Sequence, residues 1–197
     1  MANTTRLIAA LLLLSACGPT PAGDVLRPAG APAAEPVLGQ GPSLLLTAPR
    51  QASLAPIGAA GARQLWRGAG NIAMQTDGAR VVATAGLAQS VMATRLDGPD
   101  PLEDPRALVG REATARRTVD LAGADRDPAS MRFGLTLECV LRGRAEGGWI
   151  LVEERCGGDV AAFTNRFWAE PATGLVRRSE QWAGDAIAPL ALQWRGM

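Results

Sequence analysis

Two of the three cysteines in this 197-residue chain, Cys139 and Cys156, are spaced for a structural disulfide. Their spacing differs from that of a redox centre, which typically uses two cysteines separated by two residues. They lie in two strand-like segments, residues 133–142 and 149–156, on either side of a glycine-containing turn. If this hairpin turns about Gly147, the cysteines lie directly opposite each other, where Cα atoms are about 4.5–5.5 Å apart and a disulfide can form.

The third cysteine, Cys17, ends a segment with the features of an export signal. Arg6 is followed by an apolar run at residues 7–14 and two small residues, the layout of a secretory signal peptide. The run is too short to span a bilayer as a helix, which takes about 20 residues. Residues 14–17 resemble the lipobox of bacterial lipoproteins, in which the cysteine thiol is acylated before cleavage. We therefore expect cleavage after residue 16 and a lipid on Cys17, with a plain signal peptide as the alternative.

Export has two consequences for the mature protein. An oxidising compartment favours a disulfide between Cys139 and Cys156, with two buried free thiols as the alternative. The two or three acyl chains usual in bacterial lipoproteins anchor a protein almost permanently, because each buried methylene contributes about 0.8 kcal/mol. Gly18 occupies the position where an Asp would retain the protein at the inner membrane of enteric bacteria. We therefore expect a lipid-anchored protein of the outer membrane, facing the periplasm.

The absence of histidine limits the chemistry that the chain can perform. Histidine is the commonest general base and metal ligand, so serine triads and histidine zinc sites are excluded. The carboxylate pairs Glu103/Asp104 and Glu153/Glu154 are sequence neighbours, and neighbours on a strand point to opposite faces. They are therefore poor candidates for the paired carboxylates that cleave glycosides. The sequence predicts a protein that is not an enzyme and holds neither cofactor nor metal.

The charge balance indicates which partners to expect. The formal net charge is +1 and includes Arg6 of the export signal, so the mature chain is nearly neutral. Nucleic-acid-binding domains usually carry a strong basic excess. We therefore expect no nucleic-acid partner, and expect the membrane to be reached through the N-terminal lipid.

The elements that position these residues begin after a proline-rich stretch. Residues 17–63 contain a proline every few positions, and proline lacks the backbone donor that helices and sheet ladders require. The stretch predicts a disordered lipoprotein tether of Pro, Ala and Gly. One apolar island, residues 43–47, is expected to dock on the domain as an edge strand. The domain itself is expected to span residues 64–197.

The pattern of the domain predicts an all-β fold. An Asp-Gly dipeptide at residues 77–78, between two extended runs, strongly predicts a two-residue hairpin. Residues 86–96 fit a short helix or a strand, whereas the prolines of residues 97–105 predict a loop. The remaining runs predict strands at residues 71–76, 79–84, 112–121, 133–142, 149–156, 163–168, 175–182 and 190–194. Short strands with frequent turns indicate an antiparallel meander.

The C-terminal strands contain motifs that resemble a known family. Phe163-Thr-Asn165-Arg-Phe-Trp168, Thr173-Gly174 and Arg178-Ser179-Glu-Gln181-Trp182 resemble the C-terminal signature of YjbF-family lipoproteins, which are related to lipoproteins of group 4 capsule operons. Residues 76–87, including Arg80, resemble the family's N-terminal hairpin, and residues 100–102 resemble the loop that follows. The chain departs from the family in its longer linker, in Glu180, where a basic residue is expected, and in its cysteine pair.

The resemblance implies both a fold and a function. The fold is a curved, half-barrel-like antiparallel sheet with a concave face, without catalytic activity. The function is that of an outer-membrane lipoprotein that supports exopolysaccharide or capsule production or export as a binding or assembly component. The implied partners are an outer-membrane β-barrel, periplasmic polysaccharide-export proteins and the polysaccharide itself. Two alternatives remain open: a periplasmic carrier of lipid or lipoprotein with an apolar half-barrel cavity and, behind it, a polysaccharide-modifying enzyme.

The C-terminal strands also supply candidate binding residues. On the concave side we expect Trp168 and Trp182 to stack on sugar rings or to contact a partner, while Arg177, Arg178 and Gln181 supply hydrogen bonds. The alternative is that both tryptophans belong to the core, which is favoured because the chain has five Trp, three Phe and no Tyr. An open groove edged by Trp and Arg would favour saccharide binding, whereas an apolar interior cavity would favour the carrier.

Replacing the lipidated cysteine tests the anchor. We expect Cys17→Ala to release the protein from the membrane fraction, because no thiol remains at that position to accept an acyl chain. Membrane and soluble fractions of the producing cells are compared by immunoblot, with Cys139→Ala as the control that keeps Cys17. Retention of the Cys17→Ala protein at the wild-type level in the membrane fraction would contradict the lipid anchor.

Overall fold

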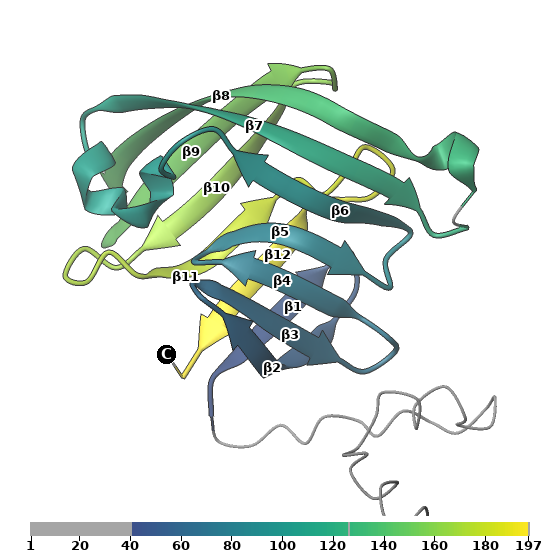
Figure 1. Cartoon of the computed structure of the whole chain (residues 1–197). Helices are drawn as coiled ribbons and strands as arrows, with labels where there is room; N and C mark the ends of the chain where they lie inside the picture. Colours follow the sequence, from purple (N-terminus) through teal and green to yellow (C-terminus); the bar gives the residue numbers. More distant parts are fainter. Residues whose placement is uncertain (1–40, 126, 197) are drawn as a thin grey trace, which may run out of the picture. The chain divides into compact units, whose positions relative to one another are not determined.

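The computed structural model describes residues 41–125 and 127–196. These residues form one antiparallel sheet of twelve strands in the order β5-β4-β3-β2-β1-β12-β11-β10-β9-β8-β7-β6 (Figure 1), which confirms the all-β fold. Their helical structure consists of three short 3-10 turns. Within these residues, no helix is both long and apolar enough to cross a membrane. The predicted signal peptide, Cys17 and the tether up to residue 40 lie outside the described residues.

The elements follow one another along the chain with short connections. The first half comprises β1 (Ser43–Ala48), β2 (Ala52–Ala60), β3 (Arg63–Gly68), β4 (Ala73–Asp77), β5 (Arg80–Ala85), β6 (Gln89–Leu96), η1 (Pro101–Glu103) and η2 (Pro105–Leu108). The second half comprises β7 (Glu112–Gly123), η3 (Pro128–Ser130), β8 (Arg132–Glu146), β9 (Trp149–Gly158), β10 (Phe163–Ala169), β11 (Val176–Gln181) and β12 (Leu190–Arg195).

The sheet is curved so strongly that its two edges approach each other. The edge strands β5 and β6 are consecutive in sequence, and they lie side by side in Figure 1. Across this seam the backbone N–H of Val91 donates to the hydroxyl of Thr84 at 3.0 Å. The expected curved, half-barrel-like sheet is therefore confirmed, and its curvature makes it nearly closed.

The sheet begins at Ser43 and not near residue 64, so the prediction of a tether up to residue 63 is wrong over β1, β2 and the start of β3. The prediction failed because the prolines are placed where strands tolerate them. Pro42 precedes β1, Pro49 lies between β1 and β2, and Pro56 adjoins the register shift between β2 and β3. The apolar island of β1 is also not an edge strand, because it pairs with β12 on one side and β2 on the other.

The segment that fitted either a helix or a strand is β6, and the predicted proline-rich loop contains η1 and the start of η2. Gly86 makes the turn before β6 possible, because its φ is +78° and an added Cβ would lie 2.3 Å from the carbonyl oxygen of Asn71. In the loop, the Asp100 carboxylate accepts a hydrogen bond from the backbone N–H of Leu102 at 3.0 Å. This cap fixes Asp100 at the beginning of η1.

The hairpin of β8 and β9 has the predicted register. Cys139 pairs with Cys156, Leu141 with Glu154, and Arg142 with Glu153. The two cysteines form a disulfide with their Cα atoms 4.1 Å apart. Positive φ angles at both turn glycines, residues 147 and 148, are those of the two-residue hairpin turns that match strand twist.

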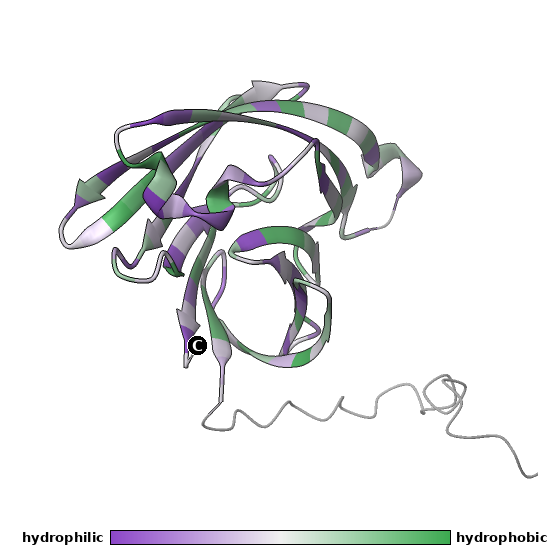
Figure 2. Cartoon of the chain, turned by 60° about the vertical axis from the view of Figure 1, so that its left-hand side comes forward, coloured by the Kyte–Doolittle hydropathy of each residue, from purple (hydrophilic) through white to green (hydrophobic). Residues whose placement is uncertain are grey.

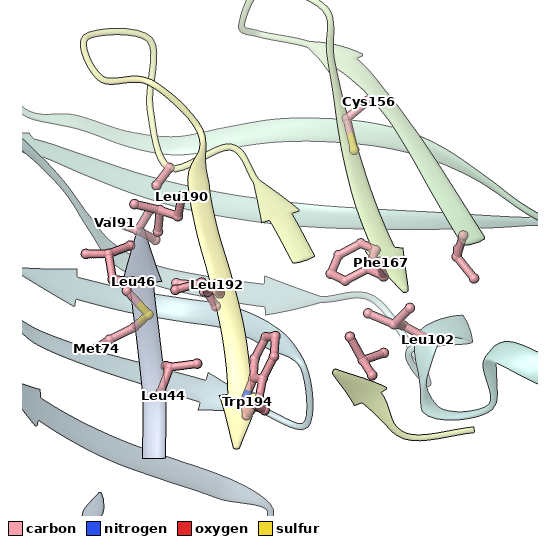
Figure 3. Close-up of a cluster of buried hydrophobic side chains, with 14 of the residues drawn as sticks. Leu44, Leu46, Met74, Val91, Leu102, Cys156, Phe167, Leu190, Leu192 and Trp194 are labelled. Carbon is pink, nitrogen blue, oxygen red and sulfur yellow. The ribbon is translucent and has the colours of Figure 1, made fainter. Parts of the chain in front are cut away.

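The interior of the curved sheet is filled by side chains. Hydrophobic and hydrophilic residues alternate along many of the strands (Figure 2), as expected where one face is buried and the other exposed. Leu44, Leu46, Leu192 and Phe167 are fully or almost fully buried and belong to one hydrophobic cluster (Figure 3). These side chains fill the interior around this cluster.

Removal of the disulfide tests its structural role. We expect the double variant Cys139→Ala/Cys156→Ala to lose about 2–4 kcal/mol of unfolding free energy, because the bridge restricts the unfolded chain. Urea unfolding followed by circular dichroism measures the difference. Dithiothreitol should destabilise the wild type and leave the double variant unchanged. Equal stability of both proteins without reductant would contradict a disulfide in the folded protein.

Candidate functional site

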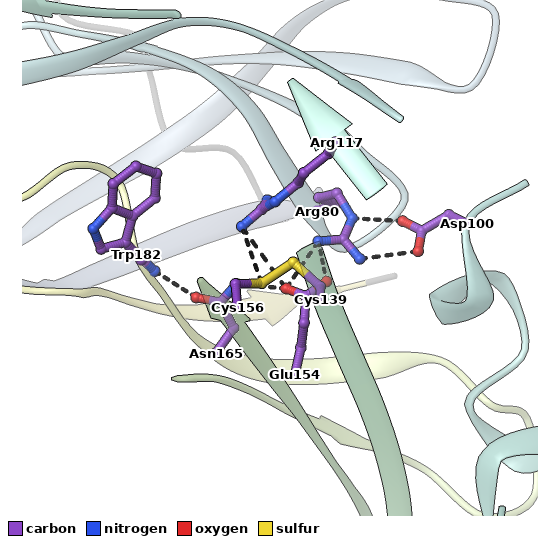
Figure 4. The surroundings of a disulfide bond; sticks show 8 residues. All are labelled: Arg80, Asp100, Arg117, Cys139, Glu154, Cys156, Asn165 and Trp182. Atoms are coloured by element: carbon purple, nitrogen blue, oxygen red, sulfur yellow. Dashed lines mark hydrogen bonds and ion pairs between the residues drawn. A yellow bond between two sulfur atoms is a disulfide. The ribbon is translucent and has the colours of Figure 1, made fainter. Parts of the chain in front are cut away.

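A cluster of charged residues lies buried inside the sheet (Figure 4). At its centre, Arg80 and Glu154 are both 0% exposed, with 2.9 Å between Nη1 and Oε1. Arg80 also donates two hydrogen bonds to the Asp100 carboxylate, from Nε to Oδ2 at 2.6 Å and from Nη2 to Oδ1 at 2.9 Å. This two-point contact is the geometry that guanidinium and carboxylate groups favour.

Each partner reaches the centre from a different part of the chain. Arg80 is the first residue of β5 and pairs with Asp77 across the two-residue turn of Gly78 and Ala79, one position later than the predicted Asp77-Gly78 turn. Glu154 points inward from β9, as do its fully or almost fully buried neighbours Val152 and Cys156. Asp100 is held by the cap of η1. The cluster therefore connects the edge strand β5 to β9 across the interior of the sheet.

A second arginine, Arg117 on β7, extends the cluster towards the disulfide. It is 4% exposed, and its Nη2 lies 3.9 Å from Oε2 of Glu154 and 4.0 Å from Sγ of Cys156. Its Nε has no hydrogen-bond partner among the described residues. Two arginines and two carboxylates make the cluster formally neutral, which limits the cost of burying four charges.

Two amide side chains complete the hydrogen bonding around the cluster. Asn165 on β10 donates from Nδ2 to Oε2 of Glu154 at 2.5 Å and accepts from the backbone N–H of Trp182 at 2.7 Å. Gln181 on β11 accepts from the backbone N–H of Val81 at 2.9 Å and donates to the carbonyl of Ala79 at 2.8 Å. The Gln181 amide thus forms hydrogen bonds with backbone groups at the start of β5, on the side where no further strand pairs with them.

The surroundings keep both carboxylates ionised. Burial alone would raise the pKa of Glu154, but Arg80, Arg117 and the hydrogen bond from Asn165 outweigh it and lower that pKa. For Asp100, the two-point contact with Arg80 likewise outweighs burial, so its pKa is lowered. Burial lowers the pKa of Arg117 to about 10, which still leaves it charged at neutral pH. Such a cluster fixes structure and is not poised to exchange protons.

On the outer face, cross-strand neighbours form a row of alternating charges. The row runs from Glu112 through Arg142, Glu153, Arg166 and Glu180, one residue on each of β7 to β11. The Arg166 guanidinium lies 3.2 Å from Glu180 and 3.6 Å from Glu153. This explains why an acidic residue stands at position 180, where the resemblance predicted a basic one.

Three of the five predicted binding residues lie together on the outer face. Trp168 and Arg178 are direct cross-strand neighbours, and the Arg178 guanidinium lies 3.8 Å from the centre of the Trp168 ring. Arg177 lies beside them and donates from Nε to Glu170 at 2.8 Å. All three line an open groove of about 310 Å³, together with Trp149 and Gln193.

The structure places the other two predicted residues elsewhere. Gln181 is 2% exposed and belongs to the hydrogen bonding around the buried cluster. Trp182 is half-buried against the core, where its ring stacks on Phe163 with centroids 4.5 Å apart. The core alternative therefore describes Trp182 and not Trp168, and the five residues do not form one site on the concave face.

Comparison with known proteins places this arrangement in a family. The family model described as group 4 capsule polysaccharide lipoprotein gfcB, YjbF, matches residues 40–194. The chain belongs to the YjbF family. No curated protein sequence matches it. The crystal structure of the hypothetical lipoprotein YmcC from Escherichia coli K12 is similar, with a TM-score of 0.63, 19% identity, and coverage of 79% of this chain and 85% of YmcC.

Five of the residues that carried the YjbF resemblance lie in or beside the buried cluster. Arg80 comes from the N-terminal hairpin motif, Asp100 from the following loop, and Asn165, Ser179 and Gln181 from the C-terminal signature. Arg80, Asp100 and Asn165 belong to the buried cluster or bond to it. Gln181 bonds Ser179 and the backbone on either side of Arg80. In this YjbF-family protein the motifs therefore describe how the curved sheet is held together.

Three residues around these sites were not predicted from the sequence: Glu154 and Arg117 in the cluster, and Trp149 in the groove. Glu154 could have been found, because the predicted register placed it opposite Leu141, whose alternating strand pattern points inward. A buried carboxylate requires a cation, which would have directed attention to the arginines. Trp149 offered no such indication, because it lies at the first position of β9.

Loss of Arg80 tests whether the cluster holds the fold. We expect Arg80→Met to lower the unfolding free energy by about 3–5 kcal/mol at neutral pH, because two buried carboxylates lose their main cation. Arg166→Met, which breaks exposed ion pairs on the outer face, should cost no more than about 1 kcal/mol. Urea unfolding measures both variants. Equal losses would show that the buried pair has no special role.

The same variant should reverse the pH dependence of stability. The folded-state pKa values of Asp100 and Glu154 lie below their ordinary values of 3.8 and 4.5. Their contribution to wild-type stability is therefore complete above these values and is lost as pH falls through the lowered folded-state values. Without Arg80, burial raises the pKa of Glu154, so Arg80→Met should gain stability as pH falls from about 7 to about 5.

Proposed function

We propose that this protein is a lipid-anchored component of the outer membrane, facing the periplasm, that supports production or export of an extracellular polysaccharide without catalysing a reaction. The match of residues 40–194 to the family of group 4 capsule polysaccharide lipoproteins is the observation that carries this proposal. The partners we propose are an outer-membrane β-barrel, periplasmic export proteins and the polysaccharide.

The buried cluster supports a role without catalysis. Glycoside cleavage needs one protonated carboxyl group and a second carboxylate facing the substrate. Asp100 and Glu154 both contact Arg80 and have lowered pKa values. Neither is therefore suited to donate a proton at neutral pH. The ion pairs and lowered pKa values of Asp100 and Glu154 favour a structural role for these residues over catalysis in a polysaccharide-modifying enzyme.

The outer groove supports direct contact with a saccharide. Its floor is the stacked pair of Trp168 and Arg178, and Trp149 beside it is 38% exposed. Aromatic rings offer sugar rings a large apolar contact, and Arg and Gln side chains supply hydrogen bonds. The groove thus has the open, Trp- and Arg-edged form that distinguishes a saccharide surface from a carrier's cavity. Trp149 takes the role that we first expected of Trp182.

The interior argues against the carrier of lipid or lipoprotein. An acyl chain would need a continuous apolar cavity, because burying charge beside it without a partner is costly. The interior instead holds a packed hydrophobic cluster and the charges of Arg80, Arg117, Asp100 and Glu154. Assembly or saccharide binding therefore accounts for the described residues better than transport of a lipid.

Gene deletion in the producing bacterium tests the proposal. We expect the deletion strain to lose extracellular polysaccharide, measured as hexose in the culture medium and on the cell surface, and the wild-type gene to restore it. Complementation with Trp149→Ala should restore less, because loss of an aromatic contact weakens binding roughly two- to tenfold.

The matched control is Leu65→Ala, since Leu65 is 37% exposed, as against 38% for Trp149, but lies on β3 outside the groove. It should complement fully. Unchanged polysaccharide in the deletion strain, under conditions that express the gene, would contradict the proposed function. Equal complementation by Trp149→Ala and Leu65→Ala would contradict a role of the groove in the proposed function.

A further inference from the structure

A second and larger hollow opens at one end of the sheet, with a volume of about 580 Å³. Its lining comes from the turns between β2 and β3, β4 and β5, and β10 and β11, from the loop before η1, and from β6 and β12. Its volume lies within the range of roughly 300–1,000 Å³ typical of small-molecule sites. It lies on the inner side of β11 and β12, where Val176 and Trp194 are buried, whereas Arg178 and Gln193 line the outer groove.

One wall of this end pocket is apolar. Val82, Leu102 and Val176 are 3–7% exposed and lie beside Leu96 in the lining. Figure 3 shows Leu102 and Trp194 among the buried side chains of the hydrophobic cluster. Such a wall favours a ligand with an apolar face.

Two hydrogen-bonding groups of the lining have no partner among the described residues, and neither atom is sealed from solvent. Trp194 is 4% exposed and Thr94 is 5% exposed, and both line the pocket. Among residues 41–125 and 127–196, neither the indole N–H of Trp194 nor the hydroxyl of Thr94 makes a hydrogen bond. A ligand that fills the pocket displaces the water that can pair these two groups, and a buried Trp N–H usually has an acceptor. These groups therefore point to a ligand that carries hydrogen-bonding oxygens.

The rim of the pocket carries charged groups that can accept hydrogen bonds. Asp77 forms an exposed ion pair with Arg63 at 3.4 Å, and Glu103 is exposed in η1. Asp100 also lines the pocket, but both of its oxygens already accept hydrogen bonds from Arg80 or Leu102. Asp77 and Glu103 are thus the carboxylates available to hydroxyl groups of a ligand.

We infer that the end pocket binds one or two sugar residues of a glycan chain. A sugar ring presents an apolar C–H face to the wall of Val82 and Val176, oxygens to Trp194 and Thr94, and hydroxyl donors to Asp77 and Glu103. An acyl chain would fill the apolar wall but leave the Trp194 N–H and the Thr94 hydroxyl unpaired, which is unfavourable. The inference rests on the proposed function for the identity of the glycan, and it adds a site separate from the outer groove.

Binding of oligosaccharides to blocked and unblocked pockets tests the inference. The probe is a fluorescein-labelled oligosaccharide mixture released by mild acid from the extracellular polysaccharide of the producing bacterium. Fluorescence anisotropy is measured with the full lipoprotein in nanodiscs. We expect Ala62→Trp to abolish most binding, because Ala62 is exposed in the β2–β3 turn and lines the pocket.

Two further variants make the result specific. Ala59→Trp places the same ring on an exposed alanine of the same hairpin, outside the lining, and should bind as the wild type does. Thr94→Val keeps the side-chain shape and removes one hydroxyl, so it should weaken binding roughly two- to tenfold. Circular dichroism verifies that all three variants fold.

The possible outcomes separate the pocket from the proposed function. Binding that is unaffected by Ala62→Trp but weakened by Trp149→Ala would overturn the pocket and support the outer groove. Absence of oligosaccharide binding to the wild type would also overturn the pocket, even if deletion of the gene abolishes the polysaccharide. Loss of binding in Ala62→Trp, together with retention in Ala59→Trp, would establish it.

Discussion

The structure depends on one buried interaction, the contact of Arg80 with Glu154 and Asp100. Ionised groups are costly to bury, so such a cluster is stable only when each charge has a partner and remaining polar atoms are hydrogen-bonded. Here the partners come from β5, β9 and the loop of η1, and Asn165 and Gln181 add hydrogen bonds from β10 and β11. Strands far apart in the sheet order are thereby joined across its interior. The ion pairs determine which wall faces which, whereas the hydrophobic cluster only requires that apolar faces turn inward.

Because the charged and hydrophobic clusters occupy much of the interior, we place the candidate recognition sites at the surface. The alternation of strand residues places Phe167 inward and Trp168 outward on β10, and Glu154 inward and Glu153 outward on β9. Glu154 therefore serves the buried cluster and Glu153 the outer charge row, so the two carboxylates of this pair do not face a shared catalytic space. The outer groove and the end pocket lie on opposite sides of β11 and β12. The protein thus presents two partly aromatic hollows next to a packed hydrophobic cluster, which suits a binding component of polysaccharide production.

Local patterns predicted much of the fold. The glycines at positions 147 and 148 and the alternation of β8 predicted the hairpin register and the disulfide, and Asp77-Gly78 located the turn before Arg80 to within one residue, since its two turn residues are Gly78 and Ala79. Two features were hidden from such patterns. The prolines of residues 42–56 suggested a tether, because their harmless positions at strand ends and a bulge are visible only once the pairing is known. The contact of Arg80 with Glu154 joins residues 74 positions apart, and which strands face each other across the interior depends on the accumulated registers and curvature of the whole sheet.

The ionisation of Glu154 in the intact protein tests the central role of the buried cluster most directly. Its side-chain carboxyl carbon can be followed by NMR between about pH 7 and about pH 3, and the midpoint compared with the value of glutamate in a model peptide. If Arg80 and Arg117 stabilise the carboxylate as described, the Glu154 resonance shows no titration until the pH falls well below its ordinary pKa of 4.5. A titration midpoint at or above 4.5 in the folded protein would show that the carboxylate is not held by these arginines, and would contradict the account of how the sheet is closed.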